Sequence, residues 1–402
     1  MRSGVCLPAF VLVAALAACG GHAPRPLGPS SAPASDLKGA PSGPAAPGSS
    51  DRRAGTATVS PREPAVHDLD VIHLEVVGRD PHGEPVLDAV APGPLLEKGN
   101  TALAAGKQEE ALASYRKLLS DFPDSKLAPV ALFNVALVHE ARADWDQAIA
   151  TYRELVKTFP TGRESIDAHL RIAALQAEHS KWRESIATLT EVLARNDLTH
   201  ADRVEALARR GYVLLEAGDL AASEQALTDA IGVWRRAVRI EDPYFIAMAH
   251  YYLGEIAHRK FEAAPLRLPD DQLERDLAAK EALAVAAYDR WKEALGFKNA
   301  YWATASGYQM SQIFMEFWQA AVRAPYPQAM DVRARDQYVI EVHQRVRHNL
   351  EKALDGHRMN VELAKAYGVS TSWSEASRGR ATEILAILGR EARGELVDRP
   401  SL

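Results

Sequence analysis

Small and hydrophobic side chains recur at a fixed interval through the middle of the chain. Two sets of the same residue types stand 37 residues apart, Ala111, Tyr115, Leu118 and Pro123 in one and Ala148, Tyr152, Leu155 and Pro160 in the other. The set returns in a weaker form as Ser185, Leu189 and Val192. An interval of this size is typical of stacked helical hairpins, which mostly bind other proteins rather than catalyse reactions.

From Pro94 onward the pattern predicts helix after helix. A first hairpin is expected at 94–121, a third unit at 164–198, a fourth at 202–240, and later helices at 273–295, 301–322, 331–367 and 371–393. The sequence therefore predicts an all-α fold, an α-solenoid of about six hairpins with a diverged helical bundle toward the C-terminus.

The small residues of the first hairpin stand at informative positions. Gly99 lies where the two helices approach closely, Gly106 makes the turn, Ala111 occupies the tight contact and Pro123 closes the unit. These residue types and offsets resemble the tetratricopeptide repeat, although the interval is longer than the usual ~34 residues. The resemblance implies that the first helix of each hairpin lines a concave face.

Two short segments before the helices favour strands. Leu69–Val77 is rich in β-branched residues, and Pro85–Val90 can pair with it across a turn. A two-stranded hairpin alone is only marginally stable, so it needs support from the helices or from a partner. Residues 20–66 contain no aromatic residue and are dense in Pro, Gly, Ser and Ala, which predicts a disordered, partly extended spacer.

The N-terminus has the features of a targeting signal. Arg2 precedes an apolar stretch, Leu7–Leu16, that is too short to span a bilayer. The stretch ends on Leu16-Ala17-Ala18-Cys19, which resembles a bacterial lipoprotein lipobox; a plain signal peptide cut after a small residue is the alternative. The lipobox implies acyl chains on Cys19, and Gly20 in place of Asp resembles lipoproteins sent to the outer membrane. We therefore expect a lipid-anchored protein that faces the periplasm.

This segmentation predicts six regions along the chain. They are a signal peptide at 1–18, a lipidated Cys and linker at 19–66, a β-hairpin at 67–91, tetratricopeptide-like repeats at 92–260, diverged helices and a cap at 261–394, and a tail at 395–402.

The amino-acid composition argues against several classes of function. The net charge of -6 leaves no basic footprint for nucleic acid. The only cysteines are Cys6, which is discarded with the signal, and Cys19. Thiol catalysis, disulfides and cysteine-based metal sites are therefore excluded from the processed chain.

No catalytic motif occurs in the sequence with the residue spacing that its chemistry requires. Gly99 to Lys107 superficially resembles a phosphate loop, but the glycines lie too far apart and Gln108 stands where Ser or Thr is needed. His250 and His258 lie eight residues apart on one expected helix, and His343 and His348 lie five apart. Neither spacing suits a pair of helical metal ligands. We predict no enzymatic activity, metal, cofactor or small-molecule substrate.

The first helices of the units supply a candidate protein-binding groove. By the geometry that the resemblance implies, the groove contains Asn100, Leu103, Phe133, Leu137, Glu140, Leu170, Tyr212, Leu215, Tyr251, Glu255 and His258. The set lacks the Lys and Arg ladder with which such repeats clamp a C-terminal carboxylate. It favours an extended or helical protein segment with apolar anchors. Packing between hairpins is an equally good interpretation of Phe133, Leu137 and Leu170.

Large aromatic residues gather in the diverged part of the chain. The helical spacing of this set favours a core role over a binding site; the set is Trp291, Tyr301, Trp302, Tyr308, Phe314, Phe317 and Trp318. A deep polar cleft around Trp302 and His343 would instead favour an enzyme or a glycan-binding module.

Two further resemblances bear on function. Segments 288–291, 301–305 and 324–327 resemble tetratricopeptide lipoproteins of the myxobacterial gliding-motility machinery. The linkers at 122–128 and 159–162 resemble envelope lipoproteins of the barrel-assembly and peptidoglycan-associated families. The sequence thus predicts a membrane-anchored, non-enzymatic scaffold that binds protein partners in an envelope complex such as a motility machine. A barrel-assembly or peptidoglycan-associated factor is the alternative.

Overall fold

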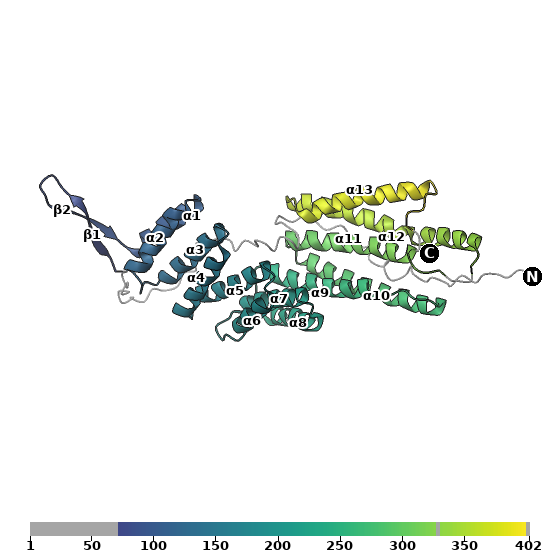
Figure 1. Ribbon diagram of the computed structural model, residues 1–402, viewed down its shortest axis with the longest axis horizontal. Coiled ribbons are helices and arrows are strands. Elements are labelled where there is room, and N and C mark those ends of the chain that lie inside the picture. The colour runs from purple at the N-terminus through teal and green to yellow at the C-terminus, as the bar shows by residue number, and fades with distance from the viewer. Residues whose placement is uncertain (1–70, 327–329, 399–402) are drawn as a thin grey trace, which may run out of the picture. The chain divides into compact units, whose positions relative to one another are not determined.

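The computed structural model describes residues 71–326 and 330–398. Over these residues the chain forms thirteen helices and one two-stranded sheet (Figure 1). It divides after Leu198 into an N-terminal unit, described over 71–198, and a C-terminal unit, described over 199–326 and 330–398. The predicted signal peptide, Cys19, the linker and residues 399–402 lie outside the described residues.

The N-terminal unit begins with the predicted β-hairpin. Strand β1 (His73–Arg79) pairs antiparallel with β2 (Pro85–Val90), with a bulge between Val76 and Gly78. The Asp80 carboxylate closes the turn, because its Oδ1 accepts the backbone N–H groups of His82 (2.8 Å) and Glu84 (2.9 Å). The hairpin prediction is confirmed, with β1 ending two residues later than expected.

Six helices complete this unit as three successive pairs. Their bounds are α1 Pro92–Ala104, α2 Gln108–Asp121, α3 Ala128–Ala141, α4 Trp145–Thr158, α5 Arg163–Glu178 and α6 Trp182–Leu193. The predicted periodic residues form the core between them: Ala111, Tyr115, Leu118, Ala148, Tyr152, Leu155, Leu189 and Val192 are all 0% exposed. The repeated pattern therefore marks the buried face of each second helix.

Glycine permits the closest helix–helix approaches. A Cβ atom added to Gly99 on α1 would lie 2.4 Å from Tyr115 Cε1 on α2, closer than packed atoms allow. The equivalent glycine of a later pair, Gly211, lies as close to the side chain of Leu227. The predicted role of Gly99 in the close contact is confirmed.

The third and fourth pairs carry serine where the first two carry a tight-contact alanine. Ser185 Oγ donates to the carbonyl oxygen of Ala173, and Ser223 Oγ donates to that of Gly211, each at 2.7 Å. Both serines are fully buried. The hydroxyl is therefore accommodated because a backbone carbonyl on the paired helix accepts its hydrogen bond.

The C-terminal unit contains longer helices. Their bounds are α7 His200–Glu216, α8 Leu220–Arg236, α9 Tyr244–Ala263, α10 Asp270–Gly296, α11 Ala300–Val322, α12 Val332–Tyr367 and α13 Ser372–Ala392. Consecutive helices pack as pairs, and α9 also contacts both α7 and α8. The sequence pattern changes near residue 260, whereas the contacts divide the chain at residue 198, because the α7–α8 pair packs on α9.

Large aromatic side chains fill the core of this unit, as the spacing predicted. Trp291, Trp302 and Trp318 are almost completely buried, whereas Tyr308 and Phe314 are half-buried. Residue Trp291 on α10 lies over Gly254 on α9, where a Cβ atom would be 2.4 Å from the indole Nε1.

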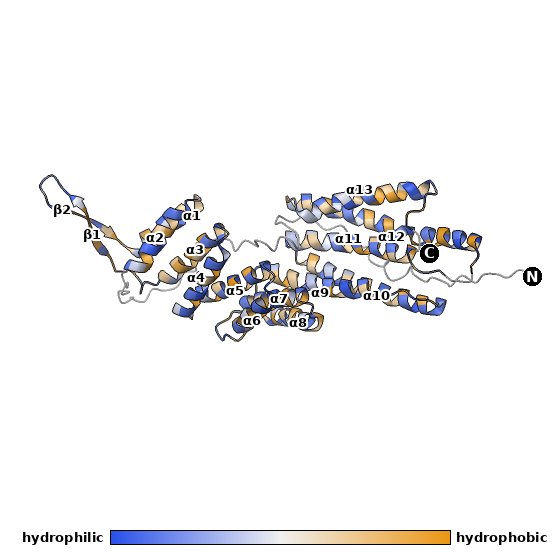
Figure 2. Ribbon diagram, viewed as in Figure 1, coloured by the Kyte–Doolittle hydropathy of each residue, from blue (hydrophilic) through white to orange (hydrophobic). Residues whose placement is uncertain are grey.

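The helices are amphipathic rather than apolar throughout, and Figure 2 shows hydrophilic and hydrophobic residues alternating along them. None of the helices that the structure describes is long and apolar enough to cross a membrane.

Candidate binding surface

All eleven predicted groove residues lie on the first helices of the pairs, α1, α3, α5, α7 and α9. In the N-terminal unit, Asn100 on α1 is exposed and joins two hydrogen bonds. Its Oδ1 accepts from Tyr115 Oη and from Asn134 Nδ2, both at 2.8 Å. Burial raises the pKa of Tyr115 to about 12, so its hydroxyl remains a donor at neutral pH. Asn100 therefore links α1, α2 and α3.

Glu140 on α3 is the acidic residue predicted for this part of the groove. Its carboxylate accepts from Tyr152 Oη (2.6 Å) and from Arg171 Nε (3.0 Å), and it also contacts Arg171 Nη2. The two charged side chains are only 10% and 14% exposed. Glu140 and Arg171 thus form a charge-matched ion pair between two first helices, which leaves little net charge for a ligand.

The apolar residues of the predicted set differ in accessibility. Leu103, Phe133 and Leu137 are half-buried, and the Phe133 ring packs 5.2 Å from that of Tyr152. Leu170, by contrast, is only 4% exposed. Leu170 therefore contributes to packing rather than to an accessible surface.

The first predicted residues of the C-terminal unit show the same contrast. Tyr212 on α7 is half-buried, with its ring 4.9 Å from that of Tyr252. Leu215 is buried, and its carbonyl oxygen accepts a hydrogen bond from Arg259 Nη1 at 2.8 Å. Only Tyr212 of this pair offers side-chain surface to a partner.

The structure brings the remaining three predicted residues into one polar group. Tyr251, Glu255 and His258 on α9 face three residues of α11, and we name the group the α9–α11 cluster: Tyr251, Glu255, His258, Gln309, Gln312 and Glu316. Tyr251 and His258 are buried, whereas Glu255 and Glu316 are partly exposed.

Two amides and one imidazole hold the carboxylates of the cluster. Gln309 Nε2 donates to Glu255 Oε1 at 3.0 Å. His258 Nε2 lies 2.5 Å from Glu316 Oε2, while Gln312 Nε2 donates to Glu316 Oε1 at 3.1 Å. The cluster therefore holds two carboxyl groups and one imidazole, so its charges are not matched when both acids are ionised.

Burial decides how the cluster titrates. It raises the pKa of Glu255 to about 7, because an ionised carboxylate is poorly solvated there. For His258, burial favours the neutral ring, but the hydrogen bond and negative charge of Glu316 prevail and raise the pKa. Glu255 is thus poised to change its charge near neutral pH.

Sequence reasoning missed the α11 members of this cluster. Gln309, Gln312 and Glu316 stand at helical spacing on a helix otherwise rich in apolar residues. That polar stripe could have indicated that they share one face of the helix. Among the residues described, no group of His, Cys, Asp and Glu side chains has the geometry to hold a metal ion. The cluster is suited to protonation and hydrogen bonding.

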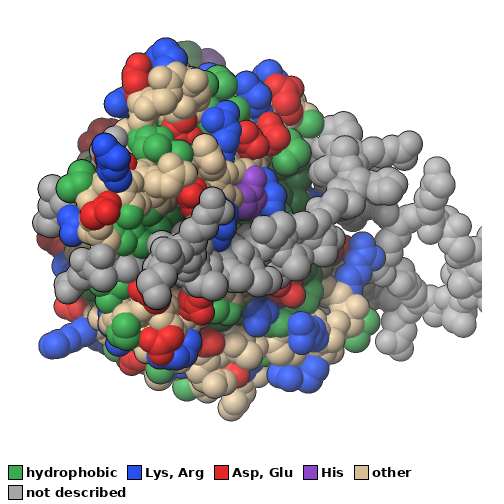
Figure 3. All heavy atoms as spheres, turned by 90° about the vertical axis from the view of Figure 1, so that its right-hand side faces the viewer, with side chains coloured by type: hydrophobic (Ala, Val, Ile, Leu, Met, Phe, Trp, Pro, Cys, Tyr) green, Lys and Arg blue, Asp and Glu red, His purple; other side chains and the backbone are tan. Residues whose placement is uncertain are grey.

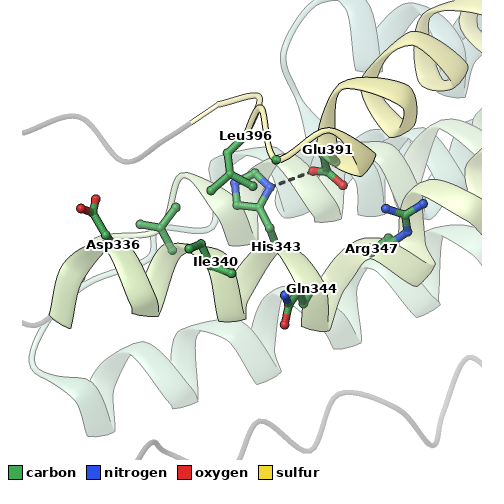
Figure 4. Close-up of a pocket in the computed structure, with 9 residues that line it drawn as sticks. Asp336, Ile340, His343, Gln344, Arg347, Glu391 and Leu396 are labelled. Carbon is green, nitrogen blue, oxygen red and sulfur yellow. Dashed lines mark hydrogen bonds and ion pairs between the residues drawn. The ribbon is translucent and has the colours of Figure 1, made fainter. Parts of the chain in front are cut away.

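A separate cavity of about 420 Å³ lies beside His343 (Figure 4). His343 Nδ1 is 2.8 Å from Glu391 Oε1, and Nε2 is 3.1 Å from the carbonyl oxygen of Asp398. The remaining lining residues are Asp336, Val339, Ile340, Gln344, Arg347, Gly394 and Leu396.

Trp302 takes no part in that cavity. Its indole ring packs against Tyr301 (4.6 Å), Tyr251 (5.1 Å) and Tyr252 (5.8 Å) in a filled aromatic core. The polar cleft around Trp302 and His343 that would favour an enzyme or a glycan-binding module is therefore not formed by the described residues.

Residues 96–163 and 170–232 match the model of the tetratricopeptide repeat family. These two segments carry tetratricopeptide repeats. The matched segments include most of the predicted groove residues, from Asn100 to Leu215, and end before the α9–α11 cluster. No curated protein matches the sequence.

Several solved structures are similar to parts of the chain. A tetratricopeptide repeat protein from Parabacteroides merdae is 13% identical over 73% of this chain and 98% of its own, with a TM-score of 0.36. Pseudomonas aeruginosa pilF is 14% identical over 73% and 96%, with a TM-score of 0.39. MamA from Desulfovibrio magneticus RS-1 is 15% identical over 51% and 94%, with a TM-score of 0.35.

The tetratricopeptide repeats indicate a protein-interaction scaffold. Their accessible first-helix residues are a mixture of polar and half-buried apolar side chains. The face drawn in Figure 3 is the right-hand end of Figure 1, where the C-terminal helices lie. It carries acidic and basic side chains side by side, without a broad area of either sign.

Proposed function

We propose that the protein is a lipid-anchored scaffold of the bacterial envelope. Acyl chains on Cys19 hold it at the outer membrane, the linker spans the periplasmic side, and the repeats bind protein partners of a complex such as a gliding-motility machine. The repeats themselves carry no chemistry in this proposal, since repeats of this kind typically serve as scaffolds.

The accessible side chains of the first helices support the proposal that the repeats bind protein partners. In the N-terminal unit, Asn100 is exposed, and Leu103, Phe133 and Leu137 are half-buried. Half-buried apolar side chains are held in place by their neighbours, so a partner can cover them at a small cost in conformational entropy. This arrangement suits an extended or helical segment that inserts apolar anchors.

The proposed lipid anchor supports a location at the bacterial envelope. A single acyl chain binds membranes only marginally, whereas several chains on one Cys give lasting attachment. Attachment raises the local concentration of the scaffold near membrane partners, so that individually weak contacts become populated. The linker then sets how far from the membrane those partners are reached.

Crosslinking in intact cells, followed by capture of the protein, tests the anchor. Cys19→Ala is the variant, and the wild-type chain is the reference. We expect the variant to leave the membrane fraction and to lose its envelope partners. Unchanged fractionation and partners would contradict the anchor. Recovery of barrel precursors or peptidoglycan hydrolases in place of motility components would favour the alternative family of functions.

A substitution on the repeats tests the binding surface separately. Leu137→Arg places a charge on a half-buried first-helix position, and Ala150→Arg adds the same charge to the exposed surface of α4. We expect Leu137→Arg to reduce partner recovery at least tenfold and Ala150→Arg to leave it unchanged. Circular dichroism of both variants shows whether the helices remain folded. Equal recovery with both variants would refute this surface.

A further inference from the structure

Apolar surface gathers on the β-hairpin at the start of the N-terminal unit. The structure exposes twelve large hydrophobic side chains among its described residues, and seven of them lie between residues 71 and 87. Isolated apolar side chains are normal on a protein surface, but a group this dense marks an interaction site. The hairpin lies outside the segments that match the repeat family.

The strand register places four of these seven side chains on one face. Leu74 pairs with Ala89, and Val76 pairs with Leu87. Because side chains alternate between the faces of a strand, these four share a face, and Ile72 extends the same series. We name Ile72, Leu74, Val76, Leu87 and Ala89 the apolar face. Its four large side chains are 54–66% exposed.

The opposite face is already engaged within the N-terminal unit. The His73 ring stacks on that of Phe122 at 4.4 Å, and Glu75 forms an ion pair with Lys117 on α2. Val90 is buried in the core beneath α1. These contacts fix one face of the hairpin against the helices and leave the apolar face outward.

The two outer edges of the hairpin are poorly suited to adding another strand. The bulge between Val76 and Gly78 interrupts the edge of β1, and Pro85 lacks a backbone N–H at the start of β2. Bulges and prolines are the features by which natural sheets resist edge pairing. The face, in contrast, contains no charged or proline residue that would keep a partner away.

We propose that two copies of the protein associate through their apolar faces. A two-fold axis sets each face against the same residues of the second copy, so the contact is complementary to itself and involves no charge. Two hairpins then form a four-stranded sandwich, which supplies the additional strands that an isolated hairpin needs for stability. This association goes beyond the proposed scaffold function, since it needs neither the repeats nor the anchor.

The chemistry of the hairpin favours a second copy over a lipid surface. The apolar face contains no aromatic, Lys or Arg side chain, the residues that anchor proteins at membrane interfaces. At the turn, the two acids Asp80 and Glu84 outnumber Arg79, so the tip of the hairpin offers no net positive charge to anionic lipids.

The size of the face sets the expected strength of association. Five side chains cover a few hundred Å², which is less than the roughly 800 Å² that each partner buries in a stable interface of ordinary size. We therefore expect a weak dimer, with a dissociation constant on the order of 10–100 μM.

Sedimentation equilibrium measures this association directly. The protein is the chain from residue 19 with Cys19→Ala, which contains no other cysteine. The double variant Leu74→Thr with Val76→Thr keeps strand propensity while removing apolar contact. We expect it to raise the dissociation constant at least tenfold. The control, Val332→Thr with Met359→Thr, changes equally exposed side chains elsewhere and should leave the constant unchanged.

Crosslinking locates the contact. Facing sheets lie about 10 Å apart, so a bismaleimide of similar reach suits the interface better than a disulfide. We expect Leu74→Cys to give a crosslinked dimer and Asp88→Cys, on the engaged face, to give little. A chain that stays monomeric at several hundred micromolar overturns the proposal. So does a ladder of larger oligomers, which indicates edge pairing, or binding to anionic vesicles that requires Leu74 and Val76.

Discussion

The first helices of the two units carry acidic residues in contrasting surroundings. In the N-terminal unit, Glu140 is matched by Arg171 and by the hydroxyl of Tyr152. In the C-terminal unit, Glu316 contacts the imidazole of His258, whereas Glu255 accepts a hydrogen bond from the amide of Gln309. The same helix-pair geometry thus supports a charge-matched contact in one unit and a titratable cluster in the other.

The difference comes from the neighbouring first helix. Helix α5 offers an arginine to α3, whereas α11 offers a glutamine and a further glutamate to α9. An arginine keeps its charge at all physiological pH values, so Glu140 faces a permanent positive charge. The α9–α11 cluster responds to pH because burial raises the pKa of Glu255 to about 7 and because its cationic group is a histidine.

Breaking the matched pair should have the largest effect. Glu140→Gln removes the negative charge opposite Arg171, whose side chain is only 14% exposed. We expect the free energy of unfolding to fall by about 3 kcal/mol at pH 7, because the largely buried guanidinium loses the negative charge of Glu140. Hydrogen exchange of α3 and α5 amides measures the change. Glu154→Gln, on the exposed surface of α4, is the control and should have little effect.

The same substitution in the cluster should act in the opposite direction. Glu255 has a pKa of about 7 in the folded chain, above the ordinary value of 4.5. The native state therefore retains a proton that the unfolded state releases, so stability falls as pH rises from about 4.5 through 7. We expect Glu255→Gln to raise the free energy of unfolding by about 2 kcal/mol at pH 8 and to have no effect below pH 4.5.

Urea titrations at pH 4.5, 6 and 8 follow this difference. Glu274→Gln, on the exposed surface of α10, is the matched control, and its effect should not vary with pH. A variant at position 255 that destabilises the protein equally at all three pH values would show that Glu255 serves only as a hydrogen-bond acceptor for Gln309.

The sequence predicted helix ends well because their signals are local. Helix α12 was expected at 331–367 and occupies Val332–Tyr367. The Asp331 side chain accepts the N–H of Ala334 at 2.9 Å, and Gly368 adopts a left-handed φ of 68° that ends the helix. Both residues stand within a few positions of the end that they determine.

The sequence could not predict the contacts between first helices. Glu140 and Arg171 lie 31 residues apart, and Glu255 and Gln309 lie 54 apart. A periodic pattern shows which face of a helix is apolar, but not which residue of the next first helix stands opposite. For the same reason, the sequence wrongly assigned Leu170 and Leu215 to the groove. Neighbouring positions on a first helix alternate between core and surface, and both of these side chains are buried.

The smallest effect is expected where the two units have the same local geometry. Ser185 in the N-terminal unit and Ser223 in the C-terminal unit are fully buried, and each hydroxyl donates to a backbone carbonyl at 2.7 Å. Replacing either with alanine, the residue that earlier pairs carry, should reduce the free energy of unfolding by about 1 kcal/mol or less. Urea titrations of both variants should give equal changes. Unequal values would place part of the contrast between the units in the packing of their helix pairs rather than in the polar contacts of their first helices.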